Sequence, residues 1–203
     1  MNYFEFFSLP RKLTIDVPAL EKQFYSLSRK LHPDRFASKP VAEQEAALAQ
    51  SSLLNDAYRT LKDPIARTQY LLTQEGVELE EQSKSATEAA RASGTEKKQI
   101  VPPELLEEVF ELNMQLAEMR AAKQMGEDEP ELRRDLMTAK DAFDAKMLET
   151  QAELERLWAD WDAAVEAEDP GLREATKDAM VALLNKRSYL RNLVRDVNEA
   201  LGV

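Results

Sequence analysis

Apolar side chains recur at helical spacing early in the chain. They return every three or four residues, at Leu20, Phe24, Leu27 and Leu31. This period is that of one face of an α-helix, and an acidic residue followed by proline, as at Asp16 and Pro18, is typical of a helix start. Pro33 disfavours α geometry at the residue before it. The pattern therefore predicts a helix that begins after Asp16 and ends before Pro33.

The next apolar pattern predicts a second, longer helix over about residues 41 to 61. Its apolar side includes Leu54, Ala57, Tyr58 and Leu61. Asp63 and Pro64 then resemble a cap and first position of a short helix, and Gly76 is a stop signal. We expect Ile65, Leu71 and Leu72 of this short helix to face inward. Four aromatic residues near the N-terminus are expected to pack on the resulting helical hairpin: Tyr3, Phe4, Phe6 and Phe7.

The remaining pattern predicts three more helices, over residues 104 to about 125, 130 to about 167, and 170 to 201. Turn residues separate them, around Gly126 and around Pro170. A three-helix bundle is the simplest arrangement of three amphipathic helices joined by short turns. The fold class is therefore expected to be all-α, with a helical hairpin at the N-terminus and a three-helix bundle at the C-terminus.

Two apolar stripes run along the helix that begins at residue 104. One suits the core of a bundle: Leu105, Val109, Leu112, Leu116 and Met119. The other lies about 120° away and comprises Leu106, Phe110 and Met114. A helix with two apolar faces either buries both or presents one to a partner, and both alternatives stay open. On the last helix we expect one inward side, with Tyr189 and Leu193 displaced from its centre: Leu172, Ala179, Leu183, Leu190, Val194, Val197 and Leu201.

Charge divides the 203 residues into three segments. Residues 1–75 have a net charge of +1, residues 76–103 of −1 and residues 104–203 of −11. The middle segment has no sustained apolar period and is rich in Ser, Thr, Ala and charged residues. We interpret 1–75 and 104–203 as two domains and 76–103 as a linker with mobility of its own.

Composition argues against several classes of protein. The chain has no Cys, one His and five isolated Gly, so the sequence predicts no thiolate or multi-histidine metal site and no glycine-rich phosphate loop. No apolar run reaches the roughly 18 to 20 residues of a membrane span, and the N-terminus does not resemble a signal peptide. We expect a soluble, unsecreted protein that binds other proteins. We also expect it to be cytoplasmic and monomeric, to have no cofactor and not to be an enzyme.

A local basic patch surrounds the single histidine. Residues 11–39 carry seven basic and three acidic residues, a net charge of +4 in a chain that is −15 elsewhere. A solvated helix face is the simplest interpretation of such a patch. Nucleic acid fits less well because the acidic remainder would repel phosphates. A small basic patch on an acidic protein favours steering toward an acidic protein surface.

The residues around this histidine resemble a known family. His32-Pro33-Asp34, between a basic helix and a longer one, resembles the signature loop of J-domain co-chaperones. With NYFEFFSLP at the start, HPDRFAS in the middle and LNDAYRTLKDPIARTQYLL from Leu54, the chain resembles the HscB-type J-proteins of bacterial iron–sulfur cluster assembly. The similarity is close over 1–75 and looser over 104–203.

The resemblance implies a function for each domain. The loop and basic helix would dock on an HscA- or DnaK-type chaperone, of the heat shock protein 70 family, and accelerate its ATP hydrolysis. The chaperone-binding residues implied are His32, Pro33, Asp34, Lys22, Arg29, Lys30 and Arg35. His32 would then be a docking group and not a catalyst.

The C-terminal helices would bind the client, the cluster scaffold protein IscU. The client-binding residues implied are Leu106, Glu107, Phe110, Glu111, Asn113, Met114 and Tyr189. Glu107 and Met114 are exchanged in character relative to the family, and Asn113 replaces a basic residue of some relatives. Three alternatives remain: a J-protein with another client, a helical scaffold with a degenerate J-domain, and a hydrolase that uses His32 as its base.

Overall fold

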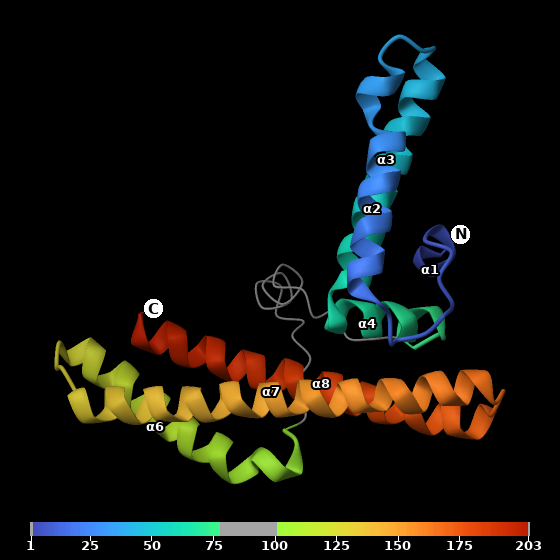
Figure 1. Cartoon of the computed structure of the whole chain (residues 1–203). Helices are drawn as coiled ribbons and strands as arrows, with labels where there is room; N and C mark the ends of the chain where they lie inside the picture. Colours follow the sequence, from blue (N-terminus) through green and yellow to red (C-terminus); the bar gives the residue numbers. More distant parts are fainter. Residues whose placement is uncertain (1, 78–100, 203) are drawn as a thin grey trace. The chain divides into compact units, whose positions relative to one another are not determined.

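The structure, a computed structural model, describes residues 2–77 and 101–202. Every regular element within these ranges is a helix, as the sequence predicted (Figure 1). Most of the expected linker, residues 78–100, lies outside the described residues. Contacts group the chain into two compact units. Unit 1 comprises Met1–Leu79 and Glu155–Asp178, and unit 2 comprises Glu80–Leu154 and Ala179–Val203.

The N-terminal helices are α1 (Tyr3–Phe6), α2 (Val17–Leu31), the 3-10 helix η1 (Pro33–Phe36), α3 (Val41–Lys62) and α4 (Pro64–Gln74). Of these, α2, α3 and α4 form where the sequence predicted helices, and α1 and η1 are two short helices that it did not predict. Asp16 caps α2 by accepting a hydrogen bond from the amide of Ala19, and Asp63 caps α4 through Ala66. Each cap satisfies an amide that the first turn of a helix leaves unpaired. Local sequence signals therefore account for the starts of α2 and α4.

α2 and α3 lie side by side as a hairpin whose core is densest near α1 and α4 (Figure 1). Buried there are Phe4, Phe7, Leu20, Leu54, Ala57, Leu61, Leu71 and Leu72. The other residues of the predicted α2 stripe are only half-buried: Phe24, Leu27 and Leu31. Two helices without a third bury part of each apolar face. The ring of Phe24 stacks on Tyr58, with centroids 4.1 Å apart.

Unit 1 also contains the end of a second hairpin. It is formed by α7 (Pro130–Glu166) and α8 (Pro170–Leu201). Asp162 of α7 accepts hydrogen bonds from the amides of Leu13 at 2.8 Å and Thr14 at 3.0 Å. Trp158 lies beside α4, where the buried guanidinium of Arg67 stacks over its ring at 4.6 Å. Burial lowers the pKa of Arg67. These contacts complete the core of unit 1.

Unit 2 is built on η2 (Pro103–Leu105), α6 (Leu106–Met125) and parts of α7 and α8. The predicted inward stripe of α6 is buried throughout: Leu105, Val109, Leu112, Leu116 and Met119. It packs against Leu136 and Phe143 of α7 and against residues of α8 near its C-terminus. Gly126 ends α6 with φ +75°, a left-handed conformation that glycine adopts without the strain a Cβ would add. The predicted three-helix arrangement is confirmed.

The predicted inward side of α8 is correct near its C-terminus and wrong near its start. Leu190, Val197 and Leu201 are buried, but Leu172 is 42% exposed. Leu193, expected off centre, is buried, and the first half of the helix buries Thr176, Met180 and Leu184 instead. A seven-residue repeat drifts by about 20° per heptad on a straight α-helix. One stripe therefore fails to follow the buried face along the whole of α8.

Within the described ranges, none of the helices combines the length and apolarity needed to cross a membrane.

Candidate functional site

The His32-Pro33-Asp34 loop is an ordered, exposed turn between α2 and α3. His32 has φ −61° and ψ 128°, an extended conformation that ends α2 as Pro33 requires. Its Nδ1 accepts a hydrogen bond from the amide of Asp34 at 3.3 Å and lies 3.4 Å from the Asp34 carboxylate. The side chains of His32 and Asp34 are 54% and 88% exposed. While Nδ1 accepts, the neutral imidazole carries its proton on Nε2, so the ring can donate to a partner.

Arg35 ties this loop back to the helix before it. Its Nη1 donates a hydrogen bond to the carbonyl of Arg29 at 3.2 Å. That carbonyl lies in the last turn of α2, where carbonyls have no partner within the helix. Arg35 therefore has a structural role in the loop as well as a positive charge on its surface.

The basic residues of α2 are presented to solvent. Lys22, Arg29 and Lys30 are all exposed. Across residues 2–77 and 101–202, no ion pair joins any of the three to a carboxylate. Their charge is therefore available to a partner. Arg29 and Lys30 lie in the last turn of α2, next to the loop, and Lys22 lies nearer the start of the helix. This geometry suits docking on an acidic protein surface.

The second apolar stripe of α6 is exposed. Leu106, Phe110 and Met114 are 55%, 68% and 59% exposed, while the neighbouring Leu105 is 1% exposed. Of the two alternatives left open by the sequence, the structure therefore supports the one in which α6 presents this face to solvent. The remaining α6 residues implied by the resemblance are exposed as well: Glu107, Glu111 and Asn113.

Tyr189 differs from the α6 residues because it is half-buried and packs against the core of unit 2. Burial raises the pKa of its hydroxyl, and the nearby Asp196 adds to the shift. One turn earlier, Lys186 forms an ion pair with Glu104 at 3.3 Å, which joins α8 to the start of η2. Glu104 has a lowered pKa because of a hydrogen bond with its own backbone and the contact with Lys186. Tyr189 thus contributes to the core of unit 2 and exposes less of its side chain to a partner than the α6 residues do.

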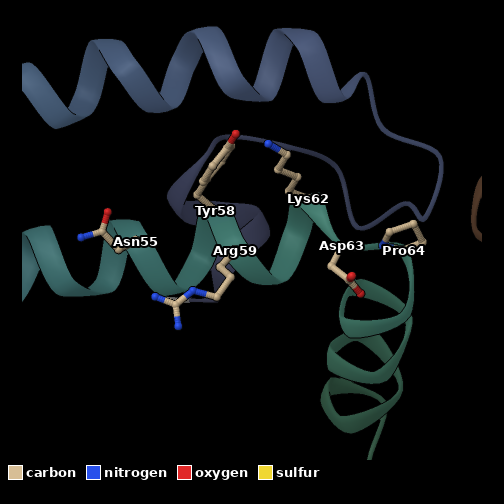
Figure 2. Close-up of a pocket in the computed structure, with 6 residues that line it drawn as sticks. All are labelled: Asn55, Tyr58, Arg59, Lys62, Asp63 and Pro64. Carbon is tan, nitrogen blue, oxygen red and sulfur yellow. The ribbon is translucent and has the colours of Figure 1, made fainter. Parts of the chain in front are cut away.

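A hollow of about 620 Å³ lies where α3 meets α4. Figure 2 shows its lining residues: Asn55, Tyr58, Arg59, Lys62, Asp63 and Pro64. Tyr58 and Lys62 reach toward α2, where the Tyr58 hydroxyl donates to Glu21 at 3.1 Å and Lys62 lies 3.8 Å from the same carboxylate. Asp63 is the cap of α4. Because these side chains hold the hairpin together, we assign no binding role to the hollow.

A group of three or more His, Cys, Asp or Glu residues arranged to hold a metal ion does not occur in the described part of the chain. Sequence reasoning did not find the contacts of Asp162 with Leu13 and Thr14, or those of Trp158 with α4. These partners lie about 90 to 150 positions away along the chain. The two tryptophans of α7, three residues apart, were the available signal that this part of the helix has a buried side.

Known proteins resemble this chain both in the sequence around the loop and in the fold. Residues 2–70 match the DnaJ domain family. The whole structure is similar to that of the chaperone HscB from Vibrio cholerae, with a TM-score of 0.60 and 26% identity over 98% of this chain and 96% of that one. It also has the fold of the human co-chaperone protein HscB, with a TM-score of 0.61, 23% identity, and coverage of 98% and 81%.

Proposed function

Because the chain is a J-domain protein of the HscB type, we propose that it stimulates ATP hydrolysis by an HscA- or DnaK-type chaperone and delivers the iron–sulfur scaffold protein IscU to it. The observation that carries this proposal is the exposed His32-Pro33-Asp34 loop at the end of a basic helix. Such a loop provides a hydrogen-bond donor, a carboxylate and nearby cations for a partner surface, and the ATP belongs to that partner.

In the proposed division of labour, residues 1–75 recruit the chaperone and residues 104–203 hold the client. The exposed stripe Leu106, Phe110 and Met114 offers the client an apolar surface. Truncation of such anchors at protein interfaces often costs about 2 kcal/mol or more of binding free energy. Glu107, Glu111, Asn113 and Tyr189 complete the proposed client surface. The monomeric state and the cytoplasmic location stay predictions.

Single-turnover ATP hydrolysis tests this function. A DnaK-type chaperone preloaded with ATP is mixed with buffer, with this protein, with the scaffold, or with both. We expect faster hydrolysis with this protein and a further increase when the scaffold is added. A sample that lacks the chaperone measures any hydrolysis by this protein itself.

The outcomes separate the alternatives. No change in the chaperone's rate would favour a helical scaffold with a degenerate J-domain. Stimulation that the scaffold leaves unchanged would favour a J-protein with another client. ATP turnover without chaperone would favour a hydrolase that uses His32 as its base.

A further inference from the structure

A groove between α6 and α7 adjoins the exposed stripe of α6. It has a volume of about 460 Å³ and lies entirely within unit 2. Its apolar part is formed by Leu112 on α6 and by Ala139, Ala142 and Phe143 on α7. Leu112 and Phe143 are buried, so they form the floor. The two alanines, three positions apart and therefore neighbours on one face of α7, leave the space that larger side chains would fill.

The rim of this groove is acidic. Three carboxylates, Glu108, Glu111 and Asp135, and one ammonium, Lys146, line it, so its net charge is −2. Glu108 is neutralised by its ion pair with Lys146 at 3.0 Å. Glu111 and Asp135 are exposed, and no cation of the described residues pairs with either. The uncompensated charge therefore comes from one carboxylate on each helix, and both belong to the groove.

We propose that this groove binds a basic, amphipathic segment of the client protein. The alkyl part of a lysine or arginine would lie against Ala139, Ala142 and Phe143, with its cationic end toward Glu111 and Asp135. Long basic side chains combine these contacts because an apolar stem carries a charged end. Met114 adjoins Glu111 on the surface of α6, three positions along the helix. A client on the exposed stripe therefore reaches this groove without leaving the surface of α6. The inference rests on the proposed function for the identity of the client.

Two substitutions on α7 test the groove without altering the α6 stripe. Asp135→Asn removes one rim charge at nearly constant shape. Ala142→Trp fills the groove from an exposed position, so the core is left intact. Matched controls lie on the same helix outside the groove lining: Asp141→Asn and Ala145→Trp, both at exposed positions. Thermal melts of all four full-length variants confirm that each is folded before binding is compared.

The first measurement uses a defined probe. A fluorescent synthetic peptide of alternating leucine and lysine is titrated with the full chain, and binding is measured from the fluorescence anisotropy of the peptide. The same titration is carried out with a peptide that has glutamine in place of lysine. We expect Asp135→Asn to weaken binding of the lysine peptide about threefold, as for loss of one exposed charge pair. Ala142→Trp should weaken it about tenfold or more because the floor is covered. Both controls should bind like the parent, and the glutamine peptide should bind more weakly.

The second measurement repeats the titration with the scaffold protein. Loss of scaffold affinity in both groove variants, with the controls unchanged, supports the inference. If Ala142→Trp leaves peptide binding intact, the groove is not a basic-segment site, whatever the scaffold does. If the groove variants spare scaffold binding while Leu106→Ala and Phe110→Ala weaken it, the inference fails and the proposed function stands. If the groove binds the lysine peptide but the parent does not bind the scaffold, the proposed client is wrong and the groove chemistry stands.

Discussion

The indole N–H of Trp158 donates a hydrogen bond to the Thr68 hydroxyl at 3.0 Å, and this contact joins α7 to α4 within unit 1. Thr68 is fully buried and its hydroxyl in turn donates to the carbonyl of Pro64 at 2.9 Å. This hydrogen bond is partly buried, and removal of one partner would leave the polar group of the other without a hydrogen bond, which lowers stability. The ring of Trp158 also supports the guanidinium of Arg67.

We predict that Trp158→Phe and Thr68→Val are coupled. Each single substitution removes the same hydrogen bond, so the double variant should be more stable than the sum of the single effects implies, by about 1 kcal/mol. Denaturant unfolding of the parent, both single variants and the double variant gives this coupling energy. Strictly additive losses would mean that the contact contributes nothing beyond the two side chains taken separately.

His32→Gln and Asp34→Asn should each abolish stimulation of the chaperone ATPase while the melting temperature stays nearly unchanged. The two side chains are largely exposed and their contacts are with each other, so neither substitution creates a cavity. Single-turnover ATP hydrolysis and thermal melts measure the two properties. Ser38→Ala, at an exposed position of the same loop, is the control and should stimulate like the parent. Full stimulation by either loop variant would remove the docking role of this loop.

Reversal of charge at Lys22, Arg29 and Lys30, each changed to Glu, should slow association with the chaperone and flatten the dependence of the association rate on salt. Exposed charges act mainly by steering, which salt screens. Stopped-flow association over a range of salt concentrations measures the effect. Reversal of the exposed Arg120, Lys123 and Arg134 in unit 2 is the matched control. The idea fails if association of the parent protein does not depend on salt.

Leu105, the last residue of η2, and Leu106, the first residue of α6, provide a sharp test of the client surface. Replacing Leu106, Phe110 and Met114 together with Ala should reduce scaffold affinity by about 2 kcal/mol or more. Because these side chains are exposed, the free energy of unfolding should change little. Leu105→Ala, one position away and buried, should instead destabilise the fold by roughly 2–5 kcal/mol. Calorimetric titration and denaturant unfolding, applied to both variants, distinguish surface from core.

Tyr189→Ala should give an intermediate result because the side chain is half-buried against the core. We expect a measurable loss of unfolding free energy together with a loss of scaffold affinity smaller than that of the α6 variant. Normal scaffold binding by folded Tyr189→Ala would confine the client surface to α6.

The helix boundaries were predictable because their signals are local. Asp16, Pro33 and Asp63 act on residues within one turn, and the structure places helix ends at each of them. The sequence allowed the exposed stripe of α6 as one of two alternatives. This helix has two apolar faces, and a helix in a three-helix bundle needs only one of them for the core. The turn of the buried face along α8 was missed, since a repeat in the sequence does not reveal which neighbour a helix packs against at each point.

The groove between α6 and α7 was beyond sequence reasoning for a related cause. In the sequence, Ala139 and Ala142 are ordinary helix residues. Their small side chains leave room for a groove only because the fold places Glu108 and Glu111 of another helix beside them. Charge counts likewise could not separate Glu108, which is paired with Lys146, from Glu111. Both distinctions depend on which side chains the fold brings together.

The contact made by Asp162 affects which substitutions the protein tolerates at the positions that Asp162 binds. Its carboxylate binds the main-chain amides of Leu13 and Thr14 and not their side chains. Every residue type except proline supplies the same amide. Position 14, whose side chain is exposed, is therefore open to substitution without any compensating change at position 162. The contact would leave no covariation between the two positions, although it joins parts of the chain separated by 148 residues.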